Sequence, residues 1–139
     1  MSADSHLTTI RRFYEALDGH DVDALDSVLS PTYRCHLAGS AEPLDLEGFK
    51  QFARGFFAAL PDLRHDVEEA IVEGDRAALR LRLRGTQRGD LMGVPATGKS
   101  VEMLALNVLH FADGTIAEHW IQADMFGLLH QLGAIAAPG

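Results

Sequence analysis

Hydrophobic residues recur at every third or fourth position in three segments of the N-terminal half, a spacing that predicts amphipathic helices. The first helix is expected over residues 7–18. A second, shorter helix follows a cap at Asp21 and ends at Pro31, because proline cannot continue a helix. The third begins after a cap at Asp45, runs to about Leu60 and carries its phenylalanines on one buried stripe.

A period of two replaces the helical spacing from Leu63 onward and predicts strands. A first strand is expected around residues 67–72, with a turn at Gly74-Asp75 after it. The run ALRLRLRG, residues 78–85, then places leucines on one face and arginines on the other. Strict alternation is typical of a sheet with one packed face and one more polar face. The arginine row is therefore expected to face solvent or a dimer partner: Arg80, Arg82 and Arg84.

Residues 100–133 are expected to form a strand, a tight turn at Asp113-Gly114, a second strand and a short helix over residues 125–132. The first of these strands is almost continuously apolar, which predicts burial on both of its faces. A brief strand over residues 33–37 lies between the second and third helices. Helices first and antiparallel strands afterwards predict an α+β domain whose helices cover one face of a curved sheet.

The register of the Asp113-Gly114 hairpin decides which side chains meet across it. A two-residue turn would set Asn107 opposite Trp120. A three-residue loop would instead set Asn107 opposite His119, with Ala105 opposite Ile121. Asn107 is the one amide in its strand, and a buried amide needs a hydrogen-bonding partner from protein, water or ligand.

Length and composition narrow the class of protein. The 139 residues fit one domain, 1–139, and the net charge of −8 argues against a nucleic-acid partner. Cys35 is the single cysteine, so no intrachain disulfide is expected, which suits the reducing cytoplasm. The start MSADSHLTT lacks the features of a secretory signal, and no apolar run is long enough to cross a membrane. No cluster of residues has metal-ligand spacing.

Five segments together resemble the SnoaL-like proteins of the nuclear-transport-factor-2-like superfamily. They are RRFYEALDGHDVDAL, PDLR, GVPATGK, DGTIAEHWIQAD and GLLHQLG, and the likeness covers residues 10–133. The resemblance implies a cone-shaped fold, with three N-terminal helices over a strongly bent antiparallel sheet and a short C-terminal helix. It also implies an apolar pocket between the two layers and a homodimer formed through the outer face of the sheet.

The best-known SnoaL-like enzymes are polyketide cyclases, which close a ring by intramolecular aldol condensation without metal or cofactor. The family alignment favours the three-residue loop and puts the catalytic carboxylate at Ile121, with supporting polar positions at Ala105 and Asn107. The predicted function is a cofactor-free enzyme that acts on an apolar, polyketide-like or polycyclic small molecule by cyclisation, isomerisation or dehydration. Ile121 motivates a second interpretation, a non-catalytic binding protein that uses the same pocket. A third, an epoxide hydrolase, would need the arginine row to face inward.

Polar residues on otherwise apolar elements are the candidates for chemistry. His119 and His36 are predicted as acid–base residues, because histidine exchanges protons near neutral pH. Asp124 is a further catalytic candidate and is also well placed to cap the last helix. Asn107 and Tyr14 are predicted to donate hydrogen bonds to the substrate. The remaining substrate-binding candidates are Trp120, Phe56, Met103 and Ile121.

Overall fold

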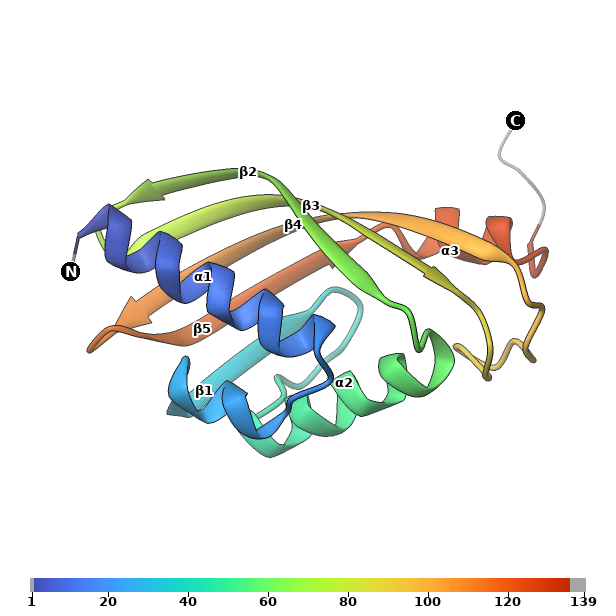
Figure 1. The fold of residues 1–139 in the computed structure, drawn as a ribbon, viewed down its shortest axis with the longest axis horizontal. Coiled ribbons are helices and arrows are strands. Elements are labelled where there is room, and N and C mark those ends of the chain that lie inside the picture. The colour runs from blue at the N-terminus through green and yellow to red at the C-terminus, as the bar shows by residue number, and fades with distance from the viewer. Residues whose placement is uncertain (1, 136–139) are drawn as a thin grey trace.

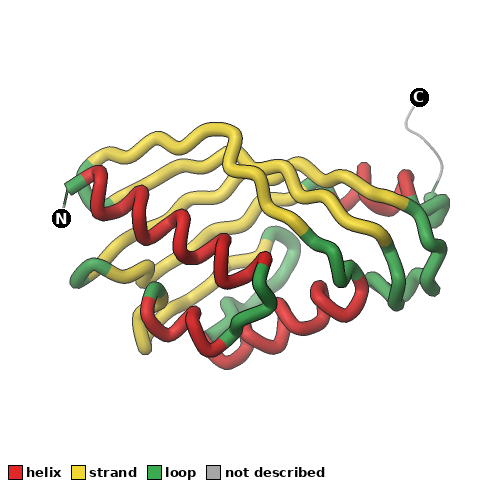
Figure 2. Tube along the Cα trace, viewed as in Figure 1, coloured by secondary structure: helices red, strands yellow, loops and turns green. Residues whose placement is uncertain are grey.

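The computed structural model describes residues 2–135 and consists of one helical layer against a curved five-stranded sheet (Figures 1 and 2). In the described residues, no helix has the length and the apolar character needed to cross a membrane. The elements in chain order are α1 (Ala3–Asp18), η1 (Asp23–Ser27), β1 (Leu29–Leu37), α2 (Leu46–Ala59), β2 (Arg64–Glu73), β3 (Arg76–Thr86), β4 (Ser100–Ala112), β5 (Thr115–Ala123) and α3 (Met125–Gln131).

The strand order across the sheet is β1-β5-β4-β3-β2. The pairs from β2 to β5 are antiparallel, whereas β1 runs parallel to β5 at the edge. Helices α1 and α2 both lie on the concave side, with α1 near β2 and α2 near β1 (Figure 1). The predicted α+β architecture, with helices over one face of a bent sheet, is confirmed.

The segment between the first helix and α2 differs from its prediction. The expected second helix is a single 3-10 turn, η1, and β1 begins at Leu29, so Pro31 lies within a strand and not at the end of a helix. Proline has no backbone N–H and is tolerated in a strand that lies at the edge of a sheet. The position of β1 at the edge therefore explains why Pro31 does not interrupt it.

Strand β4 is buried on one face only, which corrects the prediction of burial on both. Its inward side chains alternate with exposed ones, and Leu104, Leu106 and Val108 are 48%, 58% and 41% exposed. The reason is that α1 and α2 lie on the concave side, so no helix or strand within residues 2–135 covers the outer side chains of the central strand. The sheet therefore has an enclosed inner face and an apolar outer face at β4.

The hairpin joining β4 and β5 adopts neither predicted register. Ala112 pairs with Thr115 across a two-residue turn, and Asp113 takes a positive φ of 52° there. The pairing then shifts between Phe111↔Ile116 and His110↔Glu118, which leaves Ala117 as an extra residue in β5. A bulge of this kind moves every later residue of the strand by one position. Asn107 consequently lies opposite Ile121.

The cap of α2 allows a direct test of the helix that carries three of the four phenylalanines lining the space between the helices and the sheet. The Asp45 carboxylate accepts a hydrogen bond of 2.8 Å from the Gly48 backbone N–H. Asp45→Ala should lower the free energy of unfolding by about 1 kcal/mol in urea denaturation, because that N–H loses its partner. Asp45→Asn, which can still accept, should stay within about 0.5 kcal/mol of the parent chain. Equal losses in both variants would contradict a capping role.

Candidate active site

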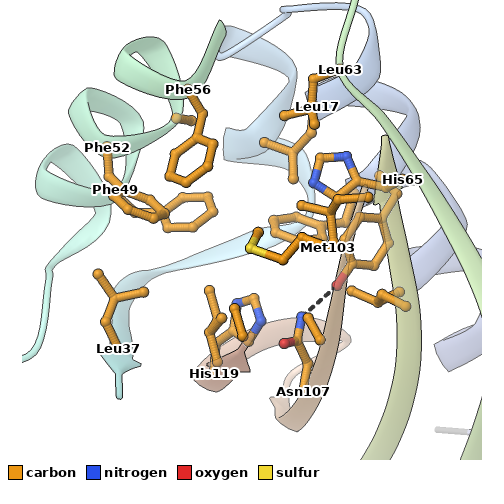
Figure 3. A pocket seen from close by; sticks show the side chains of 18 of the residues that line it. Leu17, Leu37, Phe49, Phe52, Phe56, Leu63, His65, Met103, Asn107 and His119 are labelled. Carbon is orange, nitrogen blue, oxygen red and sulfur yellow. Dashed lines mark hydrogen bonds between the residues drawn. The ribbon is translucent and has the colours of Figure 1, made fainter. Parts of the chain in front are cut away.

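A cavity of about 180 Å³ lies between the helices and the concave face of the sheet (Figure 3). Its wall is mainly aliphatic and aromatic, and four polar residues interrupt it: Tyr14, His65, Asn107 and His119. An apolar hollow with a few convergent polar groups is the usual form of a small-molecule site. The apolar lining comprises Phe13, Leu17, Leu37, Ala38, Phe49, Phe52, Ala53, Phe56, Leu63, Leu81, Leu83, Met103, Ala105, Ile121, Ala123 and Met125.

His65, near the start of β2, is paired with Asp18, the last residue of α1. Its Nδ1 lies 2.7 Å from Asp18 Oδ1, and its backbone N–H also donates to both oxygens of that carboxylate at 3.1 and 3.2 Å. A carboxylate accepts hydrogen bonds, so Nδ1 carries the proton and Nε2 is the nitrogen able to take up another. The pair has the arrangement of a general base held in one tautomer by a carboxylate.

Tyr14 and Asn107 form a second polar pair, which joins α1 to β4. Asn107 Nδ2 donates to Tyr14 Oη at 2.9 Å (Figure 3). Burial raises the pKa of Tyr14 well above its ordinary value, and the hydrogen bond from Asn107 opposes only part of that rise. The phenol therefore keeps its proton and can donate it to a ligand oxygen. The ring of Tyr14 lies 5.2 Å from that of His65, so donor and base are neighbours.

His119, on β5, is paired with Tyr33 of β1 in the most enclosed part of the site. Tyr33 Oη lies 2.8 Å from His119 Nδ1, and the two residues are 0% and 1% exposed. Burial lowers the pKa of His119 to about 3 and raises the pKa of Tyr33. His119 is therefore neutral near pH 7 and is a weak proton acceptor, which does not favour the predicted acid–base role.

The cavity brings together six of the nine residues predicted for the site. Tyr14, on α1, is hydrogen-bonded to Asn107, and the others project from α2 and the inner faces of β4 and β5. Inward alternation along β5 places His119 and Ile121 on the same face. The six are Tyr14, Phe56, Met103, Asn107, His119 and Ile121.

The other three lie outside the lining, which corrects their predicted placement. Trp120 alternates with His119 and so points to the outer face of the sheet. There it stacks on His36, with ring centroids 5.0 Å apart, because β1 pairs with β5 in a register that sets these two residues side by side. His36 Nε2 is 2.7 Å from Glu118 Oε2. Asp124 caps α3 by accepting from the Gly127 N–H at 2.9 Å.

The arginine row also points outward, away from the cavity. Arg80 and Arg82 both pair with Glu68, and Arg82 pairs with Glu102 as well. These ion pairs lie on the exposed side of the sheet, with the leucines of β3 on the inner side. The inward arginine that epoxide hydrolysis would require is thus not supplied by this strand.

The His65–Asp18 pair was not predicted from the sequence. The period of two that begins at Leu63 places His65 on the same face as Leu63, so the sequence pattern alone could have predicted that His65 faces the inner side of the sheet. No local pattern identifies Asp18 as its partner, because Asp18 lies 47 residues away and meets His65 only through the packing of α1 against β2. Within residues 2–135 no group of three His, Cys, Asp or Glu side chains is placed to hold a metal ion.

Helices over a bent sheet, enclosing an apolar pocket with a few polar groups, define the nuclear-transport-factor-2-like fold class. The family model for SnoaL-like polyketide cyclase matches residues 8–132. The chain belongs to this family.

Similar proteins and solved structures support the assignment to this family. The chain is 28% identical over 131 residues to aklanonic acid methyl ester cyclase AcmA of Streptomyces galilaeus, and the match covers 91% of this chain and 90% of AcmA. Among solved structures, TsrD of Streptomyces laurentii superposes with a TM-score of 0.88 at 30% identity, over 97% of this chain and 99% of TsrD. IdmH of Streptomyces antibioticus, a candidate polyketide cyclase, has a TM-score of 0.83 at 36% identity, over 92% of this chain and 98% of IdmH.

The lowered pKa of His119 predicts how stability depends on pH. In an unfolded chain histidine takes up a proton as the pH falls through about 6.5, whereas folded His119 stays neutral down to about 3. The unfolded state binds more protons in this window, so the contribution of neutral His119 is complete above about pH 6.5 and is lost as the pH falls. Between about pH 7 and about pH 5, the free energy of unfolding should fall by about 2 kcal/mol more in the parent chain than in His119→Gln. Urea titrations at the two pH values measure this difference, and equal falls would contradict it.

Proposed function

We propose that this protein is a cofactor-free cyclase that closes a ring in a polyketide-like ester by intramolecular aldol addition, with His65 as the general base. The observation that carries the proposal is the His65–Asp18 pair, 2.7 Å apart, at an apolar cavity beside the neutral phenol of Tyr14. The similarity to an aklanonic acid methyl ester cyclase supports the substrate class. The residues offer a base, a donor and an apolar enclosure, which are the requirements of this reaction.

In the proposed reaction, His65 Nε2 removes a proton from a carbon next to a substrate carbonyl. Asp18 accepts from the Nδ1 side and stabilises the imidazolium that forms. The enolate oxygen accepts a hydrogen bond from the Tyr14 phenol, whose oxygen is held by Asn107. The enolate carbon then attacks a ketone carbon of the same molecule, forming a C–C bond, and the proton on His65 passes to the new alkoxide. No atom is gained or lost.

Because position 121 carries isoleucine, the proton-transfer group of this proposal is not at the position that the family resemblance assigns to it. The position that the resemblance assigns to the carboxylate is in the cavity wall, but it carries a hydrocarbon side chain. In the proposal the proton-transfer group comes from β2 and α1, and Ile121 contributes apolar contact to the substrate. Neighbouring apolar side chains also exclude water, which strengthens the hydrogen bonds to the enolate.

Substitution of the pair tests the proposal. His65→Gln should lower kcat by about 10²- to 10⁴-fold, because the base is removed, and Asp18→Asn should cause a smaller loss. The substrate is aklanonic acid methyl ester, and the readout is a chromatographically new product of unchanged mass. His130→Gln, an exposed histidine on α3, is the matched control and should keep full activity.

Full activity in His65→Gln would overturn the assignment of the base. A second result would favour the alternative, a non-catalytic binding protein that uses the same pocket. That result is a rise in melting temperature with the ester, with the compound recovered unchanged after long incubation.

We further propose that two copies associate through the outer face of the sheet. Strand pairing sets four outward residues in one row across β2, β3, β4 and β5, namely Ile71, Ala78, Val108 and Trp120. Ile71 is 60% exposed, and Leu106 beside the row is 58% exposed. A continuous exposed apolar band of this kind is typical of an association surface. Arg80 and Arg82, which follow Ala78 on the same face of β3, are already paired with glutamates of the same chain, so they do not oppose contact between two identical faces.

The association surface is tested by placing charge on it. Leu106→Glu combined with Val108→Glu should convert a dimer to a monomer at low micromolar concentration in sedimentation-velocity runs, because two carboxylates per chain would be buried unpaired. Leu7→Glu is the control, since Leu7 is 41% exposed on α1, on the opposite side of the sheet. A parent chain that sediments as a monomer, or a dimer unaffected by the double substitution, would contradict this surface.

A further inference from the structure

We propose that His119 is a neutral hydrogen-bond donor that recognises a second oxygen of the substrate, apart from the oxygen held by Tyr14. His119 is not used by the proposed proton-transfer steps, yet it lines the same cavity and is 1% exposed. The inference deepens the proposed function, because it assigns a feature of the substrate bound at that site. Its evidence, however, is the geometry of His119 and Tyr33, which does not depend on His65 being the base.

The first step is the tautomer of the imidazole. Tyr33 and His119 are both enclosed, and their 2.8 Å contact joins the phenol oxygen to Nδ1. A neutral imidazole has one N–H, and a neutral phenol is a good donor to the nitrogen that lacks it. With the Tyr33 O–H donating to Nδ1, the remaining proton of His119 is on Nε2.

The second step is the state of Nε2. Among the described residues, no hydrogen-bond partner reaches this atom, although it is inaccessible to solvent. Buried donors in folded proteins are nearly always paired, so an unpaired one on a residue that lines a cavity indicates a place for a ligand acceptor. The rings of Phe13 and Phe49 stand 5.7 and 6.2 Å from that of His119. The neighbouring amide, Asn107, donates to Tyr14 and forms no hydrogen bond with His119.

The third step is the position of His119 relative to the rest of the site. Asn107 pairs with Ile121, so His119 is its diagonal neighbour on the inner face of β4 and β5. Figure 3 shows His119 and Asn107 side by side at one end of the cavity, with His65 at the other. The substrate is therefore expected to carry a carbonyl or ether oxygen at the His119 end, in addition to the group that reacts near His65.

A pair of shape-matched ligands tests the inference without turnover. The probes are 9-fluorenone and fluorene, two flat tricycles that differ in one carbonyl oxygen. The measured quantity is the ratio of their dissociation constants by calorimetry, fluorene over fluorenone. His119→Leu should lower this ratio about 10-fold relative to the parent chain, because the donor is lost. His119→Gln, which keeps an N–H donor, should retain most of the ratio, and Tyr33→Phe should lower it only partly.

An unchanged ratio in His119→Leu, or no measurable affinity of the parent chain for fluorenone, would overturn the inference. Loss of the ratio in Tyr14→Phe alone would do the same, because it would assign the ketone to the other donor. A loss of turnover in His65→Gln leaves the ratio unaffected, so the two proposals fail separately.

The tautomer is checked in the unliganded protein, which guards against a variant that does not fold. Long-range ¹H–¹⁵N spectra of the parent chain should show His119 with a protonated Nε2 and an unprotonated Nδ1, unchanged from about pH 8 to about pH 5. A proton on Nδ1 alone, or an imidazolium signal within this range, would overturn the inference.

Discussion

Polar groups buried in an apolar hollow must find partners, and this constraint ties the fold of the protein to its chemistry. Three pairs meet it: His65–Asp18, Tyr14–Asn107 and Tyr33–His119. Each joins two elements distant in sequence, α1 with β2, α1 with β4, and β1 with β5. The hydrogen bonds that join α1 and the edge strand β1 to the rest of the sheet thus also orient the polar groups that face the cavity. A change that loosens one of these contacts alters packing and reactivity together.

The helices cover only one face of the sheet, and this decides which strand side chains face the cavity. Because α1 and α2 both lie on the concave side, alternate residues of each strand are divided between an enclosed hollow and an outer surface. The bulge at Ala117 is part of this division, since it shifts the pairing of β5 and sets Asn107 opposite Ile121. His119 and Trp120 are consecutive in the chain, yet one is enclosed beside the cavity and the other stacks on His36 outside it.

Local patterns predicted most of the elements because their causes are local. The Asp45 cap, the phenylalanine spacing of α2 and the leucine–arginine alternation of β3 depend on neighbours within a few residues. The failures depend on distant structure. Pro31 is tolerated in β1 because that strand is at the edge of the sheet, and β4 exposes its outer leucines because no helix of the described residues lies on that side. Asp18 could not be linked to His65 from the sequence, since only the folded chain spans the 47 residues between them.

Three histidines show why residue type alone does not assign the site. His36 is bonded to Glu118 on the outer face, His65 is held by Asp18 at the cavity, and His119 is enclosed with a phenol. A carboxylate that accepts from one imidazole nitrogen fixes the tautomer, whereas enclosure without a charged partner stabilises the neutral form. The first environment suits proton transfer when it occurs at a cavity, as proposed for His65. The second suits a fixed donor, as at His119, whose pKa of about 3 keeps it uncharged where the reaction would run. In the two proposals, one histidine therefore transfers protons and another recognises a substrate oxygen, because His65 is paired with a carboxylate and His119 with a phenol.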